Sequence, residues 1–534
     1  MIPRYVLAST LVSGGGFLNG YDTGSIGGLT TMPQFKHSVG PMTPFILGFT
    51  VSLVMLAGGP PSVFAGQLAD RYGRLKVIAL GAVLFLAGAM LQGTAASLTQ
   101  FLVGRMLSGV GEGVYLGNMS VYICEIAPLK QRGMLVGMPQ FLATAGVCAG
   151  YFTCYKTVEI GSSMAWRLPY VVQGAGAALL ALSCLLLPES PRWLMLHGQR
   201  PEATRALQRL DFSLAEAERD FMASPEQSLS LSPWQSFLLL FKRGYRGRTV
   251  LALFVLGMVQ LSGIDAVIYV GTEVHVSCPG QHVDAACLQY APVLFAQAGL
   301  PSDTASFLAS GLSAVLMLAI SIPAFLFADK WGRRTSAITG GVGLAGCMLL
   351  MGTLYATGIV HMYAAAKWAV IVTVFVFGLI YCSTWNIFGK IYASEIQPSH
   401  TRAAANCVAM GLSFFANWLV AILTPILLDK SAFGAYFLFG GLTLGTLVVL
   451  AACMPETRGR SLEDIQQAFH QPRLITFPSR IKKFAMRRRR AAPTVHDRSP
   501  ATSVELDRQS SSAEQHGSTV NEMSPGVLVG VPPL

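Results

Sequence analysis

Twelve runs of about 20 mostly apolar residues, separated by short polar segments, pass through this chain of 534 residues. A helix that crosses the hydrocarbon core of a membrane needs about 20 apolar residues. The composition agrees, because 52% apolar and only 12% charged residues are typical of a polytopic membrane protein rather than of several soluble domains. The sequence therefore predicts twelve membrane-spanning helices, at 5–28, 45–69, 77–97, 100–123, 134–155, 168–187, 249–270, 305–327, 337–357, 367–391, 403–428 and 432–454.

The predicted spans form two groups of six, separated by the polar segment 188–248. This segment contains "PEATRALQRLDFSLAEAERDF" at helical spacing, which predicts a water-facing loop domain. After Ala491 the chain is rich in Ser, Pro, Gln and charge without periodicity, which is typical of disorder. We therefore expect an N-terminal six-helix bundle at 1–187, a loop domain at 188–248, a C-terminal six-helix bundle at 249–454 and a tail at 455–534.

Most lysine and arginine residues lie on one side of the predicted membrane. They occur around positions 71–76, 130–132 and 330–334, in the 188–248 loop and in the tail, whereas the segments 97–100 and 271–304 contain none. The positive-inside rule then places both termini in the cytoplasm. The net charge of +11 points to a membrane surface and not to nucleic acid. The basic cluster at 480–490 either lies beneath an anionic leaflet or is a solvated tail.

One short motif occurs after the second span and again after the eighth. "GQLADRYGRL" covers 66–75, and "FADKWGRRT" covers 327–335. Such a repeat indicates two related six-helix bundles around a central cavity, which is a transporter architecture. Asp70 and Asp329, with the arginines beside them, are expected to bridge neighbouring helix ends on the cytoplasmic face. They must separate for that face to open.

Other motifs are paired in the same way. "EIAPLKQRG" at 125–133 matches "SEIQPSHTR" at 394–402, and "PESPRWL" at 188–194 matches "PETRGRSLEDI" at 455–465. With "GYDTGSIGG" from Gly20 and "GRMLSGVGEG" from Gly104, these motifs closely resemble the sugar porter family of the major facilitator superfamily, in its fungal branch. The resemblance runs from about residue 5 to 467 and implies an all-α membrane protein with twelve transmembrane helices, which carries a monosaccharide or polyol by alternating access.

The resemblance also implies a cytoplasmic gate built from the paired motifs. Its expected residues are Asp70, Arg71, Arg74, Glu125, Arg132, Glu189, Arg192, Asp329, Arg333, Arg334, Glu395, Arg402, Glu456 and Arg458. Independently of the resemblance, Gly109, Gly113 and Gly117 recur at every fourth residue of the fourth span. This spacing predicts the close approach of a neighbouring backbone.

Asp22 and Arg105 lie inside predicted spans, at similar depths below the outer ends of spans one and four. Charges in a span are costly and normally have a partner or face a water-filled cavity. In proton-coupled sugar porters the matching Asp is the protonation site and the matching Arg tunes it; a static structural ion pair is the alternative. Glu112 lies two turns after Arg105, where the family usually has an apolar residue. It is either a second titratable group or satisfies Arg105 from below, and we favour the latter.

The substrate site implied by the resemblance differs from the family pattern at several positions. Gln140 in span five and Gln260 in span seven are retained, Asp265 replaces an Asn, and Asn417 still matches. The span-eight Asn becomes Met317, and the polar–Trp pair becomes "SF" at 413–414. Amide and carboxyl groups suit sugar hydroxyls.

Lys390 replaces a family Trp in span ten. It either joins the substrate site or extends along apolar surface to the cytoplasmic face, and we favour the latter. A pocket with Asp265 and Lys390 need not prefer glucose.

The sequence and the resemblance together predict a monomeric sugar porter of a fungal plasma membrane. Its expected partners are a sugar or polyol, protons and the lipid bilayer, and no cofactor is expected. The alternatives are a facilitative uniporter and a non-transporting sugar sensor that signals through its tail. No nucleophile–base phrase, phosphate loop or metal-ligand spacing indicates an enzyme or a cofactor.

Residues 270–289 interrupt span seven with polar and small residues. Joining Tyr269 to Tyr290 restores the family phrase as "GIDAVIYYAPVLFAQAGL", and the segment has the length of a short fungal intron. We therefore interpret it as a translated, unspliced intron. The alternative is a real extracellular insertion, closed by Cys278 and Cys287, that shields the mouth of the cavity.

Overall fold

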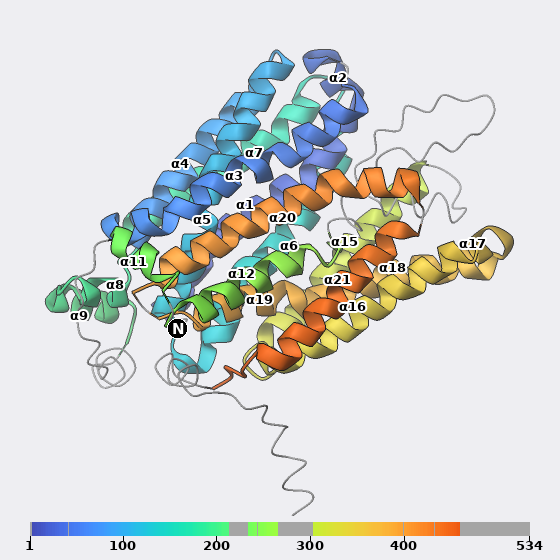
Figure 1. Cartoon of the computed structure of the whole chain (residues 1–534). Helices are drawn as coiled ribbons and strands as arrows, with labels where there is room; N and C mark the ends of the chain where they lie inside the picture. Colours follow the sequence, from blue (N-terminus) through green and yellow to red (C-terminus); the bar gives the residue numbers. More distant parts are fainter. Residues whose placement is uncertain are drawn as a thin grey trace, which may run out of the picture. The chain divides into compact units, whose positions relative to one another are not determined.

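A computed structural model describes residues 3–40, 42–212, 233–242, 244–264, 303–398, 400–431 and 433–459, which all belong to one compact unit, Met1–Pro472. In the described residues each predicted span corresponds to one helix or part of one, except span ten, which corresponds to two (Figure 1). The first half contains α1 (Arg4–Thr31), α3 (Pro44–Tyr72), α4 (Arg74–Gly93), α5 (Leu98–Ile126), α6 (Arg132–Thr157) and α7 (Met164–Leu186). A short helix, α2 (Pro33–Val39), follows α1.

The second half repeats this arrangement. It contains α12 (Arg246–Gln260), α15 (Asp303–Leu326), α16 (Arg333–Ala356), α18 (Ala364–Ser383), α19 (Trp385–Glu395), α20 (Arg402–Lys430) and α21 (Gly434–Cys453), with the short α17 (Ile359–Met362) before α18. The predicted seventh span continues to residue 270, but residues 265–302 lie outside the described part of the chain, and the 270–289 segment lies there too.

Within the described ranges, eight helical segments are long and apolar enough to cross a membrane. The predicted spans that are not among these eight include α1 and α5, which carry Asp22, Arg105 and Glu112 inside them. These charged side chains are buried in the protein. Helices that carry charge at membrane depth are expected where the charge faces a partner or an internal cavity.

Span ten is not the single helix that the sequence predicts. The helix stops at Ser383 and restarts at Trp385, because Thr384 has φ −127° and ψ −81°. The Thr384 hydroxyl and the Thr384 backbone N–H both donate to the carbonyl of Ile380, and side-chain bonds of this kind often bend helices. Gly340 of α16 lies against the Thr384 side chain. The break separates α18 from α19, the helix that carries Lys390.

Small residues allow the helices of the first half to approach closely. Gly113 of α5 lies against the backbone of Gly58 in α3, as the glycine spacing predicts, and Gly109 lies against Val54 of the same helix. Gly20 of α1 lies so close to the Ala143 carbonyl of α6 that a methyl group there would overlap it. Dispersion contacts between close backbones hold membrane helices together when lipid supplies no hydrophobic driving force.

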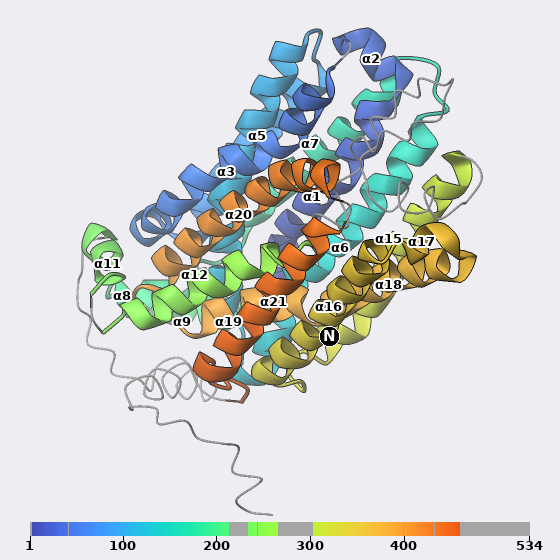
Figure 2. The ribbon, with the colours of Figure 1, turned by 45° about the vertical axis from the view of Figure 1, so that its right-hand side comes forward.

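The two halves meet along two helix pairs. α20 lies beside α3, and α15 lies beside α6 (Figure 2). α19 also reaches across to α5 and α6. The helices pack in the same way within each half: α1 packs on α6 and α4 on α7, while α12 packs on α20 and α16 on α21. The space between the halves is therefore enclosed by α1, α5 and α6 on one side and by α12, α15, α19 and α20 on the other.

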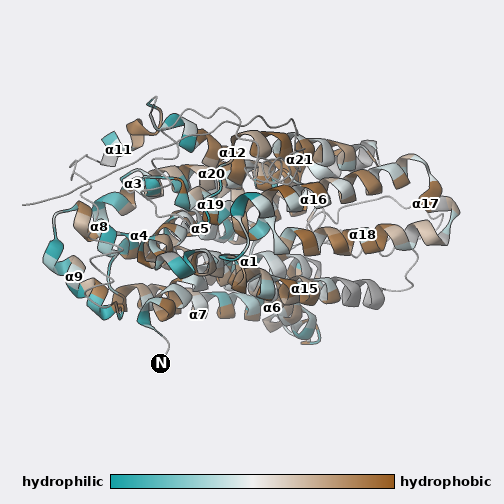
Figure 3. Cartoon of the chain, turned by 90° about the horizontal axis from the view of Figure 1, so that it is seen from below, coloured by the Kyte–Doolittle hydropathy of each residue, from teal (hydrophilic) through white to brown (hydrophobic). Residues whose placement is uncertain are grey.

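The segment between the halves is helical and amphipathic where it is described. It contains α8 (Pro191–Leu196), α9 (Arg200–Arg209) and α11 (Pro233–Leu239). In α9 the residues Ala203, Ala206 and Leu207 are buried. Figure 3 shows hydrophilic colouring on α9 and hydrophobic colouring along α16 and α18. The predicted helical pattern is confirmed as far as Arg209, and residues 213–232 lie outside the described ranges.

Candidate functional site

A cavity of about 190 Å³ lies between the two halves. Polar side chains line it from both sides. Those of the first half are Asn19, Asp22, Thr23, Arg105, Glu112, Gln140 and Thr144, and those of the second half are Gln260, Ser313, Asn386, Lys390, Ser413 and Asn417. Apolar and aromatic side chains, among them Met55, Met317, Phe375 and Phe414, fill the remaining wall. A cavity with an apolar wall and a few polar groups is the usual form of a small-molecule site.

Asp22 and Arg105 form a buried ion pair at this cavity. The Nη1 atom of Arg105 lies 2.7 Å from Oδ1 and 2.8 Å from Oδ2 of Asp22. Arg105 also donates to the carbonyls of Thr50, at 3.3 Å, and Val51, at 3.1 Å. The pair is almost completely buried, with 4% of Asp22 and 1% of Arg105 exposed. These bonds compensate the cost of placing two charges in a membrane-spanning bundle.

Gln173 of α7 is a third member of this group that the sequence reasoning missed. Its Nε2 atom donates to Asp22 Oδ1 at 3.2 Å and to the Ser25 hydroxyl at 3.5 Å. Gln173 is fully buried. A lone amide within an apolar run was the only available signal, and a single sequence does not show what such an amide contacts.

Glu112 does not satisfy Arg105 in the way we favoured from the sequence. Its Oε1 atom accepts a hydrogen bond from the Asn19 amide of α1, while Arg105 directs its donors at Asp22 and at backbone carbonyls. Asn19 lies one turn before Asp22 on the same helix, so it shares a face with Asp22. The alternative interpretation, a second titratable group at the cavity, stays a prediction.

The residues that are expected to bind the sugar lie on different helices around the cavity. Gln260 of α12 donates to the Ser413 hydroxyl of α20 at 3.1 Å. The side-chain oxygens of Gln140 and Asn417 are buried without a hydrogen-bond partner among the described residues. Buried polar atoms are nearly always paired, so these two oxygens are available acceptors for a bound hydroxyl. Asp265 lies outside the described residues.

Lys390 and Asn386 lie one turn apart on α19. Both side chains line the cavity, so Lys390 is not directed only along the helix to the cytoplasmic face, as we favoured from the sequence. The Asn386 amide donates to the Thr144 hydroxyl of α6 at 3.4 Å, which joins the two halves across the cavity. The sequence reasoning missed Asn386, although its spacing of four residues from Lys390 places both on one helix face.

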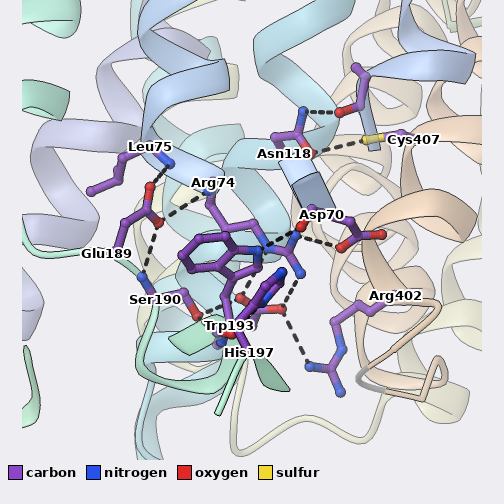
Figure 4. A network of polar contacts seen from close by, with 12 residues as sticks. Asp70, Arg74, Leu75, Asn118, Glu189, Ser190, Trp193, His197, Arg402 and Cys407 are labelled. Carbon is purple, nitrogen blue, oxygen red and sulfur yellow. Dashed lines mark hydrogen bonds and ion pairs between the residues drawn. The ribbon is translucent and has the colours of Figure 1, made fainter. Parts of the chain in front are cut away.

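A network of charged residues closes one end of the first half (Figure 4). Arg74 pairs with Asp70 at 2.6 Å and with Glu125 at 3.3 Å. Glu189 accepts from the backbone N–H groups of Arg74, at 3.1 Å, and Leu75, at 2.9 Å, at the start of α4. Burial raises the pKa of Glu189, and these backbone donors oppose that shift. A carboxylate at a helix N-terminus also interacts favourably with the helix dipole.

The second half builds the same network from the repeated motif. Arg333 pairs with Asp329 at 3.2 Å and with Glu395 at 3.0 Å. Glu456 accepts from the backbone N–H of Arg333 at 2.8 Å, as Glu189 does from Arg74. Thr457 donates to Glu395 at 2.8 Å, in the place where Ser190 donates to Glu125. We refer to the end of the protein that holds these two networks as the motif end.

Contacts at the motif end also cross between the halves. The Asp329 carboxylate accepts from the backbone N–H groups of Gly133, at 2.7 Å, and Met134, at 2.9 Å, at the start of α6. Arg402 lies 4.0 Å from Glu125. Asp70, in contrast, pairs only within its own half: its Oδ2 atom is buried without a hydrogen-bond partner among the described residues. The two copies of the motif are therefore used unequally.

The other expected gate residues lie around these networks. Arg334 donates to the Ala451 carbonyl at 2.6 Å, and the backbone N–H of Arg458 donates to Glu456 at 3.1 Å. Arg71 lies over the ring of Tyr72, with 5.3 Å between its Cζ atom and the ring centroid. Arg132 is buried at the start of α6, and Arg192 is half-buried on α8.

Comparison with known proteins gives a consistent family match. A family model described as "Sugar (and other) transporter" matches residues 8–278 and 282–469. Sugar transport protein MST7 of Oryza sativa subsp. japonica is 27% identical over 488 residues, which cover 86% of this chain and 90% of that protein. The arabinose-proton symporter of Bacillus subtilis is 27% identical over 470 residues, which cover 86% of this chain and 94% of that protein. The MFS-type transporter criB of Aspergillus cristatus is 28% identical, with 88% and 94% covered.

The fold also matches solved structures. The proton:xylose symporter XylE, bound to 6-bromo-6-deoxy-D-glucose, superposes with a TM-score of 0.70 at 23% identity, covering 87% of this chain and 99% of that chain. A structure of XylE described as inward open gives a TM-score of 0.60. The fold is therefore the twelve-helix major facilitator fold that the sequence predicts.

Proposed function

Because this chain belongs to the sugar (and other) transporter family, we propose that it carries a monosaccharide or related polyol across the membrane together with protons. It is a multi-pass membrane protein and not an enzyme. The cavity between the halves is the proposed substrate site. Gln140, Gln260 and Asn417 are its proposed hydrogen-bonding residues, and Asn386 is added on the geometry. The relatives named as sugar transport proteins and as a proton symporter support this proposal.

The observation that carries the proton coupling is the buried pair of Asp22 and Arg105 on the cavity wall. A proton that enters the cavity and binds Asp22 removes the charge that holds Arg105. The guanidinium then keeps its bonds to the Thr50 and Val51 carbonyls but loses its counter-ion. An arginine without its counter-ion at membrane depth is unfavourable, so protonation biases the bundle towards another arrangement.

The motif end is the proposed cytoplasmic gate. The Asp329 contacts with α6 and the Arg402–Glu125 contact must break when this end opens, because they join the two halves. The paired networks within each half can move as rigid parts during that step. Alternating access then exposes the cavity first to one side of the membrane and then to the other.

The finer assignments follow from the same features. We assign both termini and the 188–248 loop to the cytoplasm, because Lys and Arg cluster on that side. The six-helix bundles are assigned to 1–187 and 249–454, and the tail to 455–534. We assign the protein to a fungal plasma membrane as a monomer surrounded by lipid; the motif resemblance and the relative from Aspergillus cristatus support the fungal origin.

Uptake of labelled sugar by yeast cells that lack hexose transporters tests the proposal. Expression of the protein is expected to restore uptake, to acidify the cytosol when sugar is added and to depend on external pH. Uptake without acidification or pH dependence would instead establish the uniporter. Absence of uptake for a panel of sugars and polyols, with the protein present at the cell surface, would favour the sensor.

A further inference from the structure

Two ionisable side chains, one acidic and one basic, face the cavity from opposite halves of the protein. Glu112 belongs to α5 in the first half, and Lys390 belongs to α19 in the second. Both differ from the residue type that the sugar porter pattern has at that position, which is apolar for the first and Trp for the second. Each interacts electrostatically with the other, but they do not form an ion pair.

Lys390 is the unusual member of this pair. Among the described residues, no carboxylate lies within ion-pair distance of its ammonium group, and no side chain accepts a hydrogen bond from it. The Asp22 carboxylate is already held by Arg105 and Gln173. A lysine at membrane depth is costly unless an anion compensates its charge. The three N–H donors of Lys390 therefore remain available to a group inside the cavity.

The fold directs Lys390 towards this space. Its neighbour Gly389 packs on Leu256 and Val259 of α12, which seats α19 with the opposite face towards α5 and α6. Asn386, one turn earlier, reaches Thr144 across the cavity. The break at Thr384 frees this short helix from the direction of α18. The ammonium group is thus held on the wall of the proposed substrate site and not on the outer surface of the bundle.

Glu112 is less available than Lys390. Its Oε1 atom accepts from Asn19, which fixes the carboxyl group on the first half. A neutral sugar placed between Glu112 and Lys390 would separate the two charges without replacing either. A substrate with its own carboxylate would supply the missing partner of Lys390, while its hydroxyls could bond to the unpaired oxygens of Gln140 and Asn417.

We propose that the transported polyol is a carboxylic acid, a sugar acid such as a hexuronate, and that Lys390 binds its carboxylate. This inference rests on the proposed transport function and specifies the substrate class of the same cavity. Lys390 is then the residue that separates acidic from neutral polyols, since the ammonium–carboxylate bond is made only by the acid.

The test measures uptake of labelled D-glucuronate, D-galacturonate and D-glucose by yeast that lacks hexose transporters. The wild-type protein is expected to transport at least one hexuronate with a KM at least tenfold below that for glucose. Lys390→Gln should raise the ratio of the hexuronate KM to the glucose KM by about 10- to 100-fold, because only the hexuronate loses a bond to the ammonium group. Lys390→Arg, which keeps the charge, should retain most of the preference. Surface expression of each variant is measured in parallel, so that misfolding is recognised.

A second set of variants separates binding from simple charge neutralisation. If Lys390 served only to compensate Glu112, the double variant Glu112→Gln with Lys390→Gln would recover hexuronate uptake, and this result would overturn the proposal. A second double variant, Asp265→Asn with Lys390→Gln, tests in the same way whether Lys390 serves only to compensate Asp265, which lies outside the described residues. Persistent loss of hexuronate uptake in both double variants supports the proposal.

The proposal and the transport function fail in different ways. Glucose uptake without hexuronate uptake, and without competition by hexuronate, would overturn the acidic substrate but leave sugar transport intact. Absence of uptake of all three compounds by a protein present at the surface would overturn both.

Discussion

Asp329, in the second half of the chain, accepts a hydrogen bond of 2.7 Å from the backbone N–H of Gly133, in the first half. The symmetry-related Asp70 makes its described side-chain bond within its own half, to Arg74. The repeated motif therefore has one copy that joins the halves and one that braces a single half. Asp329 is therefore expected to act in the gate between the halves, whereas Asp70 is expected to stabilise its own half.

Asp329→Asn is expected to open the motif end. An amide is a weaker acceptor than a carboxylate, so the closed arrangement should lose about 1–3 kcal/mol. The closed-to-open ratio should fall by about 5- to 150-fold. Lys76 and Lys330 are exposed at the motif end, one in each half. Spin labels attached to cysteines at these two positions, in an otherwise cysteine-free protein, should show a longer label-to-label distance when this end opens.

Asp70→Asn is the matched control for that measurement. It alters the same motif but removes no contact between the halves that is seen among the described residues. A distance distribution that shifts as much in Asp70→Asn as in Asp329→Asn would contradict the unequal use of the two copies.

Gln260→Ala should weaken substrate binding with little effect on folding. Its amide is bonded to Ser413 on the cavity wall, and loss of a buried hydrogen bond to substrate costs about 1–3 kcal/mol. The apparent affinity should therefore fall by about 5- to 150-fold. Ser262→Ala is the control on the same part of the chain, because the Ser262 hydroxyl bonds to the Val259 carbonyl and is not among the groups that line the cavity. Equal affinities for the two variants would remove Gln260 from the site.

Gly20→Ala should destabilise the first half. The added methyl group would overlap the Ala143 carbonyl, so α1 and α6 would have to move apart. Such overpacking costs about 1–3 kcal/mol or more. Gly14→Ala, on the same helix, adds a methyl group with no atom within 4 Å and should leave stability unchanged. The melting temperature in detergent measures both, and similar values for the two variants would show that the close approach of α1 and α6 is not needed.

Residues 270–289 give a prediction about the transcript and not about the fold. The family match is interrupted inside this segment, between residues 278 and 282. If the segment is a translated intron, messenger RNA amplified across it should lack about sixty nucleotides, three for each residue. A dominant transcript that retains them would support the alternative, an extracellular insertion.

The sequence predicts the helices well because apolar runs of this length are costly to place anywhere but a membrane. The Asp22–Arg105 pair could be predicted for a related reason: two charges at matching depth need each other. The break at Thr384 could not be predicted, because a threonine that bonds to the carbonyl of Ile380 looks the same in sequence as one within an intact helix.

The partners of individual polar side chains were harder to predict. Glu112 lies on the expected helix face, yet Asn19 and not Arg105 is its hydrogen-bond donor, because the Arg105 donors are used by Asp22 and by backbone carbonyls. The orientation of Lys390 towards the cavity depends on how Gly389 packs on α12. Both outcomes are set by contacts between distant helices, which a single sequence does not encode in any local pattern.

Asp22 is the residue on which the proposed proton coupling depends, and accumulation in proteoliposomes measures that coupling most directly. With an imposed inward proton gradient, the purified wild-type protein is expected to concentrate its substrate above the external level. Asp22→Asn should lose this accumulation but retain exchange of substrate across the membrane, because the amide cannot carry the proton. Asp211→Asn, an exposed position paired with Arg4, should behave as wild type. Full gradient-driven accumulation by Asp22→Asn would contradict the account.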